Sequence, residues 1–275
     1  MHTSSSLSNK TETAKLAVLF HWLFIALLAA AFALVLAEFF GLLNLKSGWP
    51  EAALLLLAVT GTIVSLTRQL PLQNVLLAAS VIAIVGGGIS ALGAITGIPF
   101  GPFTFTAGLE PKIFNTLPWA MPLIWVVAIL NSRGVARLIL RPWRKTKIYG
   151  FWLIGLTATL VLFFDFAFDP FAARVKHFWL WSPTKFPLTW QGAPFINFLC
   201  WGFVTLLILV FVTPTLINKQ LSKRSSPDFH PLALWLGGIL IFGIACAIHG
   251  LWPAVTTDAA IGIITAVFAV RGGRW

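Results

Sequence analysis

Long runs of apolar residues, separated by short polar segments, form the dominant pattern along this chain of 275 residues. An α-helix needs about 20 apolar residues to cross the roughly 30 Å hydrocarbon core of a bilayer. On this criterion the sequence predicts eight membrane spans, at 16–39, 50–67, 74–96, 118–139, 148–168, 194–217, 231–249 and 254–270. We therefore expect an all-α fold, a polytopic integral membrane helix bundle in which residues 1–275 form one domain.

Composition supports this class of protein. Hydrophobic residues make up 58% of the chain and charged residues 10%, against about 25% charged residues in an ordinary globular protein. A soluble domain is therefore excluded. The two cysteines, Cys200 and Cys246, lie inside apolar runs, which is typical of reduced packing residues.

The first predicted span has an alternative interpretation as a cleaved signal peptide. Lys10 and Lys15 precede the apolar stretch, and Ala31-Phe32-Ala33 resembles a cleavage site. The apolar run continues to Phe40, which favours a retained helix that follows a polar tail at 1–15.

Basic residues give the expected orientation, because cytoplasmic loops carry an excess of Lys and Arg. If the N-terminus is inside, only five of the 19 basic residues fall outside, namely Lys46, Lys112, Arg174, Lys176 and Lys185. We therefore expect both termini in the cytoplasm and the protein in the cell (inner) membrane. The net charge of +11 then reflects topology and contact of segment 133–147 with anionic lipid headgroups, and does not indicate nucleic-acid binding.

Asp165 and Asp169 lie four residues apart at the end of an apolar run. This spacing places both on one face of a helix, with Cβ atoms roughly 5–6 Å apart. Charges at membrane depth are costly, and two nearby carboxyls do not both ionise readily. At least one should therefore hold a proton near neutral pH, which makes the pair a candidate proton donor. The alternative is a structural role, either capping the helix before Pro170 or pairing with Arg174 or Lys176.

Three further polar residues are candidates for the same site. Glu110 stands beside Lys112 and could equally form a surface ion pair; Glu38 lies within an apolar run, either as a third pocket acid or as an interfacial residue. Asn197 begins the sixth predicted span among aromatic residues. Its amide either bonds a neighbouring helix, as is usual in membranes, or positions a water or a carboxyl.

Two segments on the predicted outer side, 97–117 and 170–193, are unusually long. Both are rich in Pro, Gly and aromatic residues, unlike solvated linkers. Non-helical backbone at membrane depth is tolerated only where protein or a cavity surrounds it. We therefore expect these segments to be re-entrant or capping, and to cover a pocket.

The chain lacks the sequence motifs of metal, redox or phosphate chemistry. The run Gly86-Gly87-Gly88 lies inside a predicted span, without the preceding strand and following Lys of a nucleotide loop. Close helix packing explains it better. We find no haem-type His pair, no His-Glu-x-x-His and no Asp-rich magnesium motif. We therefore expect no cofactor and no metal, and chemistry that uses only acid, water and an apolar pocket.

Two sequence blocks within 97–201 resemble the membrane family of carotenoid biosynthesis hydratases, which includes the carotenoid 1,2-hydratases of the bacterioruberin and myxoxanthophyll pathways. The first block is Pro99-Phe100-Gly101-Pro102-Phe103-Thr104-Phe105-Thr106, then Leu109-Glu110-Pro111-Lys112, Pro118, Pro122 and Trp125. The second is Asp165-x-x-x-Asp169-Pro170, then Trp179, Trp181, and Pro194-x-x-Asn197-Phe198-x-x-Trp201.

This resemblance implies addition of water across the terminal 1,2 double bond of an acyclic carotenoid, giving a tertiary alcohol. Protonation at C2 leaves a tertiary cation at C1, which requires a protonated carboxyl near the alkene. We expect Asp165 or Asp169 to be that acid, with the other, Glu110 or Asn197 orienting the water. The aromatic faces of Trp179, Trp181, Trp201 or Phe168 would stabilise the cation. The same four residues would line the substrate site together with Phe103, Phe105 and Glu38.

The chain departs from the family pattern at several positions. Phe103 and Phe105 stand where the family has Tyr, Cys200 stands where Gly is usual, and the stretch between Trp181 and Pro194 differs. These changes leave the acid chemistry in place and bear on the choice of substrate. The partners implied are the acyclic carotenoid, the lipid bilayer and other carotenoid-pathway enzymes.

One alternative is a membrane transporter or a protein that binds carotenoids or other apolar lipids, with the intramembrane carboxylates binding a proton or a cation. Another is a structural or assembly partner within a pigment-making complex.

Overall fold

The structure is a computed structural model that describes residues 22–43, 49–183, 188–217 and 227–275. Two compact units divide the chain, one ending at Gly61 and the other spanning Thr62–Trp275. The first unit contains the helix Trp22–Phe39 and most of α2 (Trp49–Thr67). The helix continues through Ala31-Phe32-Ala33 without a break. The tail 1–15 and the first residues of the predicted first span, 16–21, lie outside the described residues.

Six further long helices form the second unit. They are α3 (Leu72–Thr96), α4 (Ala120–Ile139), α5 (Tyr149–Pro170), α6 (Phe195–Val212), α7 (His230–Ile248) and α8 (Trp252–Gly273). In the described part of the chain, 8 helices are long and apolar enough to cross a membrane. The predicted all-α polytopic membrane bundle is therefore confirmed, and the protein is an integral membrane protein. Short helical turns are η1 (Ala107–Leu109), η2 (Arg141–Trp143), η3 (Phe171–Val175) and η4 (Thr213–Leu216).

Helix α4 lies at the centre of the second unit, where it packs against α3, α5, α7 and α8. Its polar side chains bond to neighbouring helices. The Asn131 amide donates to the Thr62 hydroxyl over 2.8 Å, and Ser132 accepts from the Trp235 indole over 3.1 Å. Such neutral pairs satisfy buried polar atoms where water is absent.

Small residues let α3 approach α4 closely. A Cβ atom added to Gly86 would lie 2.4 Å from Cγ of Trp125, and one added to Gly87 would lie 2.9 Å from Cγ of Pro122. The packing interpretation of the glycine run is therefore confirmed at these two positions. Gly88 differs, since a Cβ there would meet nothing within 4 Å.

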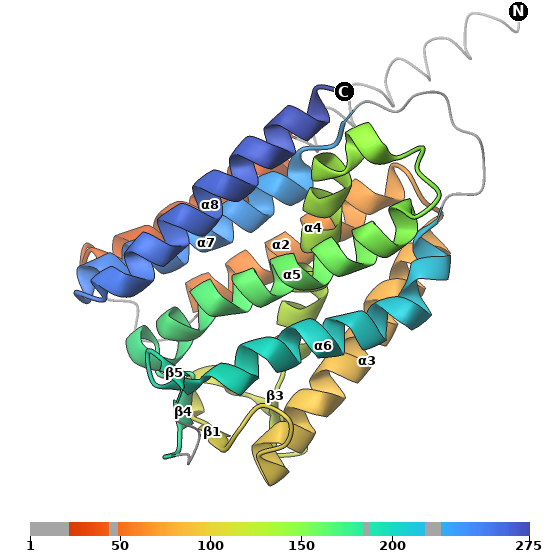
Figure 1. The fold of residues 1–275 in the computed structure, drawn as a ribbon. Helices are drawn as coiled ribbons and strands as arrows, with labels where there is room; N and C mark the ends of the chain where they lie inside the picture. Colours follow the sequence, from red (N-terminus) through yellow and green to blue (C-terminus); the bar gives the residue numbers. More distant parts are fainter. Residues whose placement is uncertain (1–21, 44–48, 184–187, 218–226) are drawn as a thin grey trace, which may run out of the picture. The chain divides into compact units, whose positions relative to one another are not determined.

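Three short antiparallel strand pairs form within the two long segments that were expected to cap the bundle. β1 (Phe103–Phe105) pairs with β4 (Trp179–Trp181), β2 (Lys112–Ile113) with β3 (Leu117–Pro118), and β5 (Thr189–Trp190) with β6 (Ala193–Pro194). The labelled strands lie together at one end of α3, α5 and α6 (Figure 1). The β1–β4 pair joins one long segment to the other, so both form a single cover, here called the strand cap (97–117, 176–183 and 188–194).

The helical backbone of α5 continues past Pro170 as the π-helical turn η3. The α-helical part of the span therefore ends at Pro170, as expected, but the chain stays helical to Val175. A π-turn within a helix is frequent at functional sites. It directs the following chain toward β4 and places the strand cap over the end of α5.

Candidate active site

Asp165 and Asp169 lie one turn apart near the end of α5, and both side chains are 0% exposed. Ala167, between them, is also 0% exposed, which shows that this end of the helix is covered on more than one face. The carboxyls therefore lie in the protein interior and away from lipid. Their hydrogen-bond partners decide what they can do.

Asp169 accepts hydrogen bonds from two tryptophans of β4. Nε1 of Trp179 lies 2.9 Å from Oδ1, and Nε1 of Trp181 lies 3.1 Å from Oδ1 and 3.3 Å from Oδ2. Alternate residues of a strand point to the same side, so the two indoles converge on one carboxyl. The sequence predicted these tryptophans as aromatic faces, whereas the structure directs their N–H edges at Asp169.

Strand β1 pairs with β4 and packs against these two tryptophans. In the β1–β4 register Phe103 stands opposite Trp181 and Phe105 opposite Trp179. The ring centroids of Phe103 and Trp181 are 5.3 Å apart, and those of Phe105 and Trp179 are 6.3 Å apart. Phe103 and Phe105 therefore pack against the indoles that hold Asp169.

Asp165 has a different partner, on α6. The amide nitrogen of Asn197 donates to Oδ2 of Asp165 over 2.8 Å, while Oδ1 of Asp165 is buried and has no hydrogen-bond partner within the described part of the chain. This places Asn197 both across a helix–helix contact and on a carboxyl, which are the two roles considered from the sequence. The partners of both aspartates are neutral groups, whereas Arg174, considered above as an ion-pair partner, is exposed.

Trp190 supplies a hydrogen bond that the helix itself lacks near the end of α5. Pro170 has no backbone N–H, so it cannot bond to the carbonyl oxygen of Phe166 four residues earlier. The indole nitrogen of Trp190 donates to that oxygen over 3.2 Å, and its ring stacks on Phe166 at 4.7 Å. Trp190 lies in the stretch that departs from the family pattern and was not predicted as a site residue. A lone Trp in a loop gives no sequence signal for such a contact.

Aromatic rings pack against one another around the end of α5 that carries the pair. Phe168 contacts Trp179 edge to face at 5.5 Å, and Phe242 of α7 contacts Phe168 at 5.1 Å. On the side of Phe166, the Phe198 ring lies 4.7 Å away. Phe242 was missed from the sequence because α7 is apolar throughout, so that its core-facing and lipid-facing residues look alike.

The remaining predicted site residues are placed differently. Glu110 is exposed after η1, and Lys112 donates to the Phe105 carbonyl oxygen. Trp201 is buried on α6 one turn from Asn197, and its ring stacks on Trp125 with centroids 3.8 Å apart. Glu38 is half-buried in the first unit. The structure therefore brings together Asp165, Asp169, Asn197, Trp179, Trp181, Phe168, Phe103 and Phe105.

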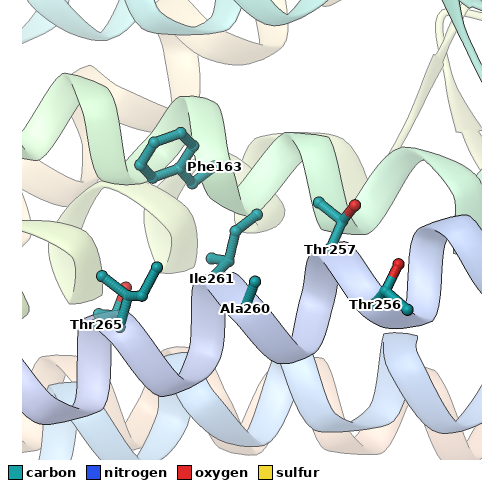
Figure 2. Close-up of a pocket in the computed structure, with 7 residues that line it drawn as sticks. Phe163, Thr256, Thr257, Ala260, Ile261 and Thr265 are labelled. Carbon is teal, nitrogen blue, oxygen red and sulfur yellow. The ribbon is translucent and has the colours of Figure 1, made fainter.

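A separate cavity of about 290 Å³ lies between α5 and α8. Figure 2 shows Phe163 on α5 and Ala260, Ile261 and Thr265 on α8, all of which line this cavity. Phe163 and Asp165 are two residues apart, about 200° around the helix, so the cavity lies on a different face of α5 from the carboxyls. The cavity has no ionisable residue in its lining, and we give it no part in the chemistry.

The fold and the site together define an integral membrane helix bundle with a buried pair of carboxyls under a cover of aromatic residues. The chain belongs to the carotenoid biosynthesis protein family, which matches residues 51–266. This match includes every residue of the site.

One similar protein is the bisanhydrobacterioruberin hydratase of Haloarcula japonica, which is 28% identical over 127 residues. The aligned part covers 45% of this chain and 41% of that protein, so the similarity spans less than half of either. No solved structure matches the chain.

Proposed function

We propose that this protein is a carotenoid hydratase that adds water to the terminal 1,2 double bond of an acyclic carotenoid end group. The product is a tertiary alcohol. The observation that carries the proposal is the buried pair Asp165 and Asp169, held by neutral donors from α6 and β4 and enclosed by aromatic rings. Membership of the carotenoid biosynthesis family supplies the substrate class, and the name of the Haloarcula relative supplies the reaction type.

The chemistry of such a hydration suits these residues. One carboxyl protonates C2 of the alkene, and the resulting tertiary cation at C1 is captured by a water molecule, which loses a proton to the second carboxyl. The reaction consumes water and returns the proton, so it needs no cofactor.

The surroundings of the pair would favour the cationic intermediate. Aromatic faces attract cations through the ring quadrupole. Phe168 contacts Trp179, which bonds to Asp169, and Phe242 contacts Phe168 in turn. A water-poor site also strengthens the interaction between the cation and a carboxylate. Under the orientation predicted from the basic residues, with both termini cytoplasmic, the site lies in the outer half of the membrane.

Expression in a host that accumulates lycopene or a related acyclic carotenoid tests this function. Pigment extracts are compared by mass spectrometry with those of a host carrying the Asp165→Asn variant. A gain of about 18 mass units per hydrated end, absent with the variant, is the expected result. Unchanged pigment across several acyclic carotenoids would contradict the proposal. If unmodified pigment then copurified with the protein, a binding role would replace the enzymatic one.

A further inference from the structure

We propose that Asp165 is the acid that protonates the alkene, that Asp169 is a carboxylate that receives the proton of the attacking water, and that Asn197 positions the acid. This division of roles rests on the proposed hydration function. It follows from the unlike hydrogen-bond partners of the two carboxyls, which otherwise share a helix and are equally buried.

The surroundings of Asp169 suit a carboxylate. An indole nitrogen is a donor only, and the two indoles contact Oδ1 at 2.9 and 3.1 Å, with a further contact of 3.3 Å to Oδ2. Donors directed at a carboxyl favour its charged form. A proton on Oδ1 would replace an acceptor by a donor that faces Trp179 and Trp181. Asp169 is therefore the ionised member of the pair.

The surroundings of Asp165 suit a neutral acid. A protonated carboxyl has one accepting carbonyl oxygen and one hydroxyl that donates. Asn197 donates to Oδ2, which makes Oδ2 the carbonyl and leaves the proton on Oδ1. If Asp165 were ionised instead, Oδ1 would be a buried charged oxygen with no donor, a costly arrangement. The hydroxyl on Oδ1 has no acceptor among the residues that the structure describes, so it is available to a carbon–carbon double bond.

Because the two side chains lie close together, the protonation state of one depends on that of the other. Two carboxyls one helical turn apart in a low-dielectric site share a single proton more readily than they both ionise. The hydrogen bonds then decide which carboxyl holds it, and the indoles place the charge on Asp169.

The proposed reaction balances as follows. The O–H bond of Asp165 breaks as the alkene π electrons form a C–H bond at C2, which leaves a cation at C1 and a carboxylate on Asp165. The oxygen of a water molecule bonds to C1, and one of its protons passes to Asp169. The proton then moves from Asp169 to Asp165 and restores the starting state, so that water is the only species consumed.

Infrared difference spectroscopy of the purified full-length protein in lipid nanodiscs tests the assignment without substrate. A protonated carboxyl has a C=O stretch that separates from the amide bands and shifts in D₂O. All variants carry Asp258→Asn as a common background, which removes the signal of a third buried carboxyl. We expect the band to disappear in Asp165→Asn and to remain in Asp169→Asn. Asn has nearly the shape of Asp, and each variant's elution as a monodisperse species reports its folding.

The opposite pattern, with the band lost in Asp169→Asn and retained in Asp165→Asn, would overturn the assignment, and so would a band that survives both substitutions. The spectrum does not depend on activity. If the protein hydrates no carotenoid but shows the expected bands, the proposed function is wrong and the assignment of protonation states stands. If the protein hydrates carotenoids but shows the opposite bands, the proposed function stands and the division of roles between Asp165 and Asp169 is wrong.

Asn197→Leu tests the positioning role, because Leu has the shape of Asn without its N–H donor. We expect the band of Asp165 to shift to higher frequency without disappearing, since the carbonyl oxygen loses its hydrogen bond. Hydration should fall by about tenfold, less than the hundredfold or more expected for loss of a general acid. An unshifted band would show that Asn197 does not act on Asp165.

Discussion

Trp190 contacts Phe166 in two ways at once. Its indole N–H donates to the Phe166 carbonyl oxygen over 3.2 Å, and the two rings stack with centroids 4.7 Å apart and planes 14° apart. This carbonyl is the one that Pro170 leaves without its helical partner. A single residue of β5 therefore supplies the missing backbone hydrogen bond of α5 within the turn that carries Asp165 and Asp169.

Substitution of Trp190 should separate these two contacts. Trp190→Phe keeps a ring for stacking but removes the donor, and we expect a loss of about 1 kcal/mol in the free energy of unfolding. Trp190→Ala removes both, and we expect roughly 1 kcal/mol more. Unfolding in mixed micelles measures both losses. Trp252→Phe, at an exposed position on α8, is the matched control, and equal losses at both positions would contradict the prediction.

Removal of the indole donors should affect the rate of hydration more than the stability of the fold. Trp179→Phe and Trp181→Phe each keep an aromatic ring in the strand cap but remove N–H bonds to Asp169. A hydrogen bond to a charged group contributes about 1.5–3 kcal/mol. We therefore expect each variant to hydrate carotenoid about tenfold more slowly, and the double variant to lose more. Initial rates in membranes measure this, and a double variant as active as the wild type would rule out a role for the indoles.

The spans and the acid pair could be predicted from the sequence because each depends on local pattern. Apolar run length fixes a membrane helix, and spacing of four places Asp165 and Asp169 on one face. The Pro, Gly and aromatic content of the two long segments set them apart from solvated linkers in the same way. These features need no knowledge of which segments meet.

The partners of the pair could not be predicted, because they depend on tertiary pairing. Trp181 meets Phe103 only through the β1–β4 register, and strands of three residues carry too little alternation to reveal that register. Phe242 of α7 was hidden for another reason. In a membrane span both faces are apolar, so hydrophobic periodicity does not mark the face that enters the core.

The contact of α3 with α4 should depend on Gly86 but not on Gly88. An added Cβ at Gly86 would overlap Trp125, which bonds to Ser90 over 2.9 Å and stacks on Trp201. We expect Gly86→Ala to lower the free energy of unfolding by about 1–3 kcal/mol, as other overpacked cores do. Gly88→Ala is a control of identical chemistry, two residues away, with open space around it. Equal melting temperatures for the two variants would contradict the packing.

At the start of α7, Asp228 should make stability depend on acid pH. Burial opposes ionisation of Asp228, but hydrogen bonds from Ser65 and His230 outweigh it and hold the pKa of Asp228 below its ordinary value of 3.8. A carboxyl with a lowered pKa in the folded state stabilises the protein above its ordinary value. That contribution is lost as the pH falls through the folded-state pKa.

The free energy of unfolding of wild type and Asp228→Asn, measured from about pH 7 down to about pH 3, checks this prediction. The difference in the free energy of unfolding between the two proteins should be constant near neutral pH and should become smaller below about pH 4. Thr67→Ala removes a hydroxyl that bonds within its own helix, to the carbonyl of Val64, so its gap to the wild type should not change with pH. A gap for Asp228→Asn that stays constant to the lowest pH would show that Asp228 does not carry this stability.

Asp258 is a buried carboxyl like Asp165, but it has no part in the proposed reaction. It is 2% exposed on α8 and packs against Gly243 of α7, and among the described residues neither of its carboxyl oxygens has a hydrogen-bond partner. A buried polar group without partners costs about 1–3 kcal/mol, and Leu has nearly the same branched shape as Asp. We therefore expect Asp258→Leu to raise the free energy of unfolding by about 1 kcal/mol or more and to leave hydration unchanged. Asp165→Leu should also fold but lose activity, because its carboxyl is the proposed acid. A destabilised Asp258→Leu protein would show that this carboxyl has a bonding role in the folded protein.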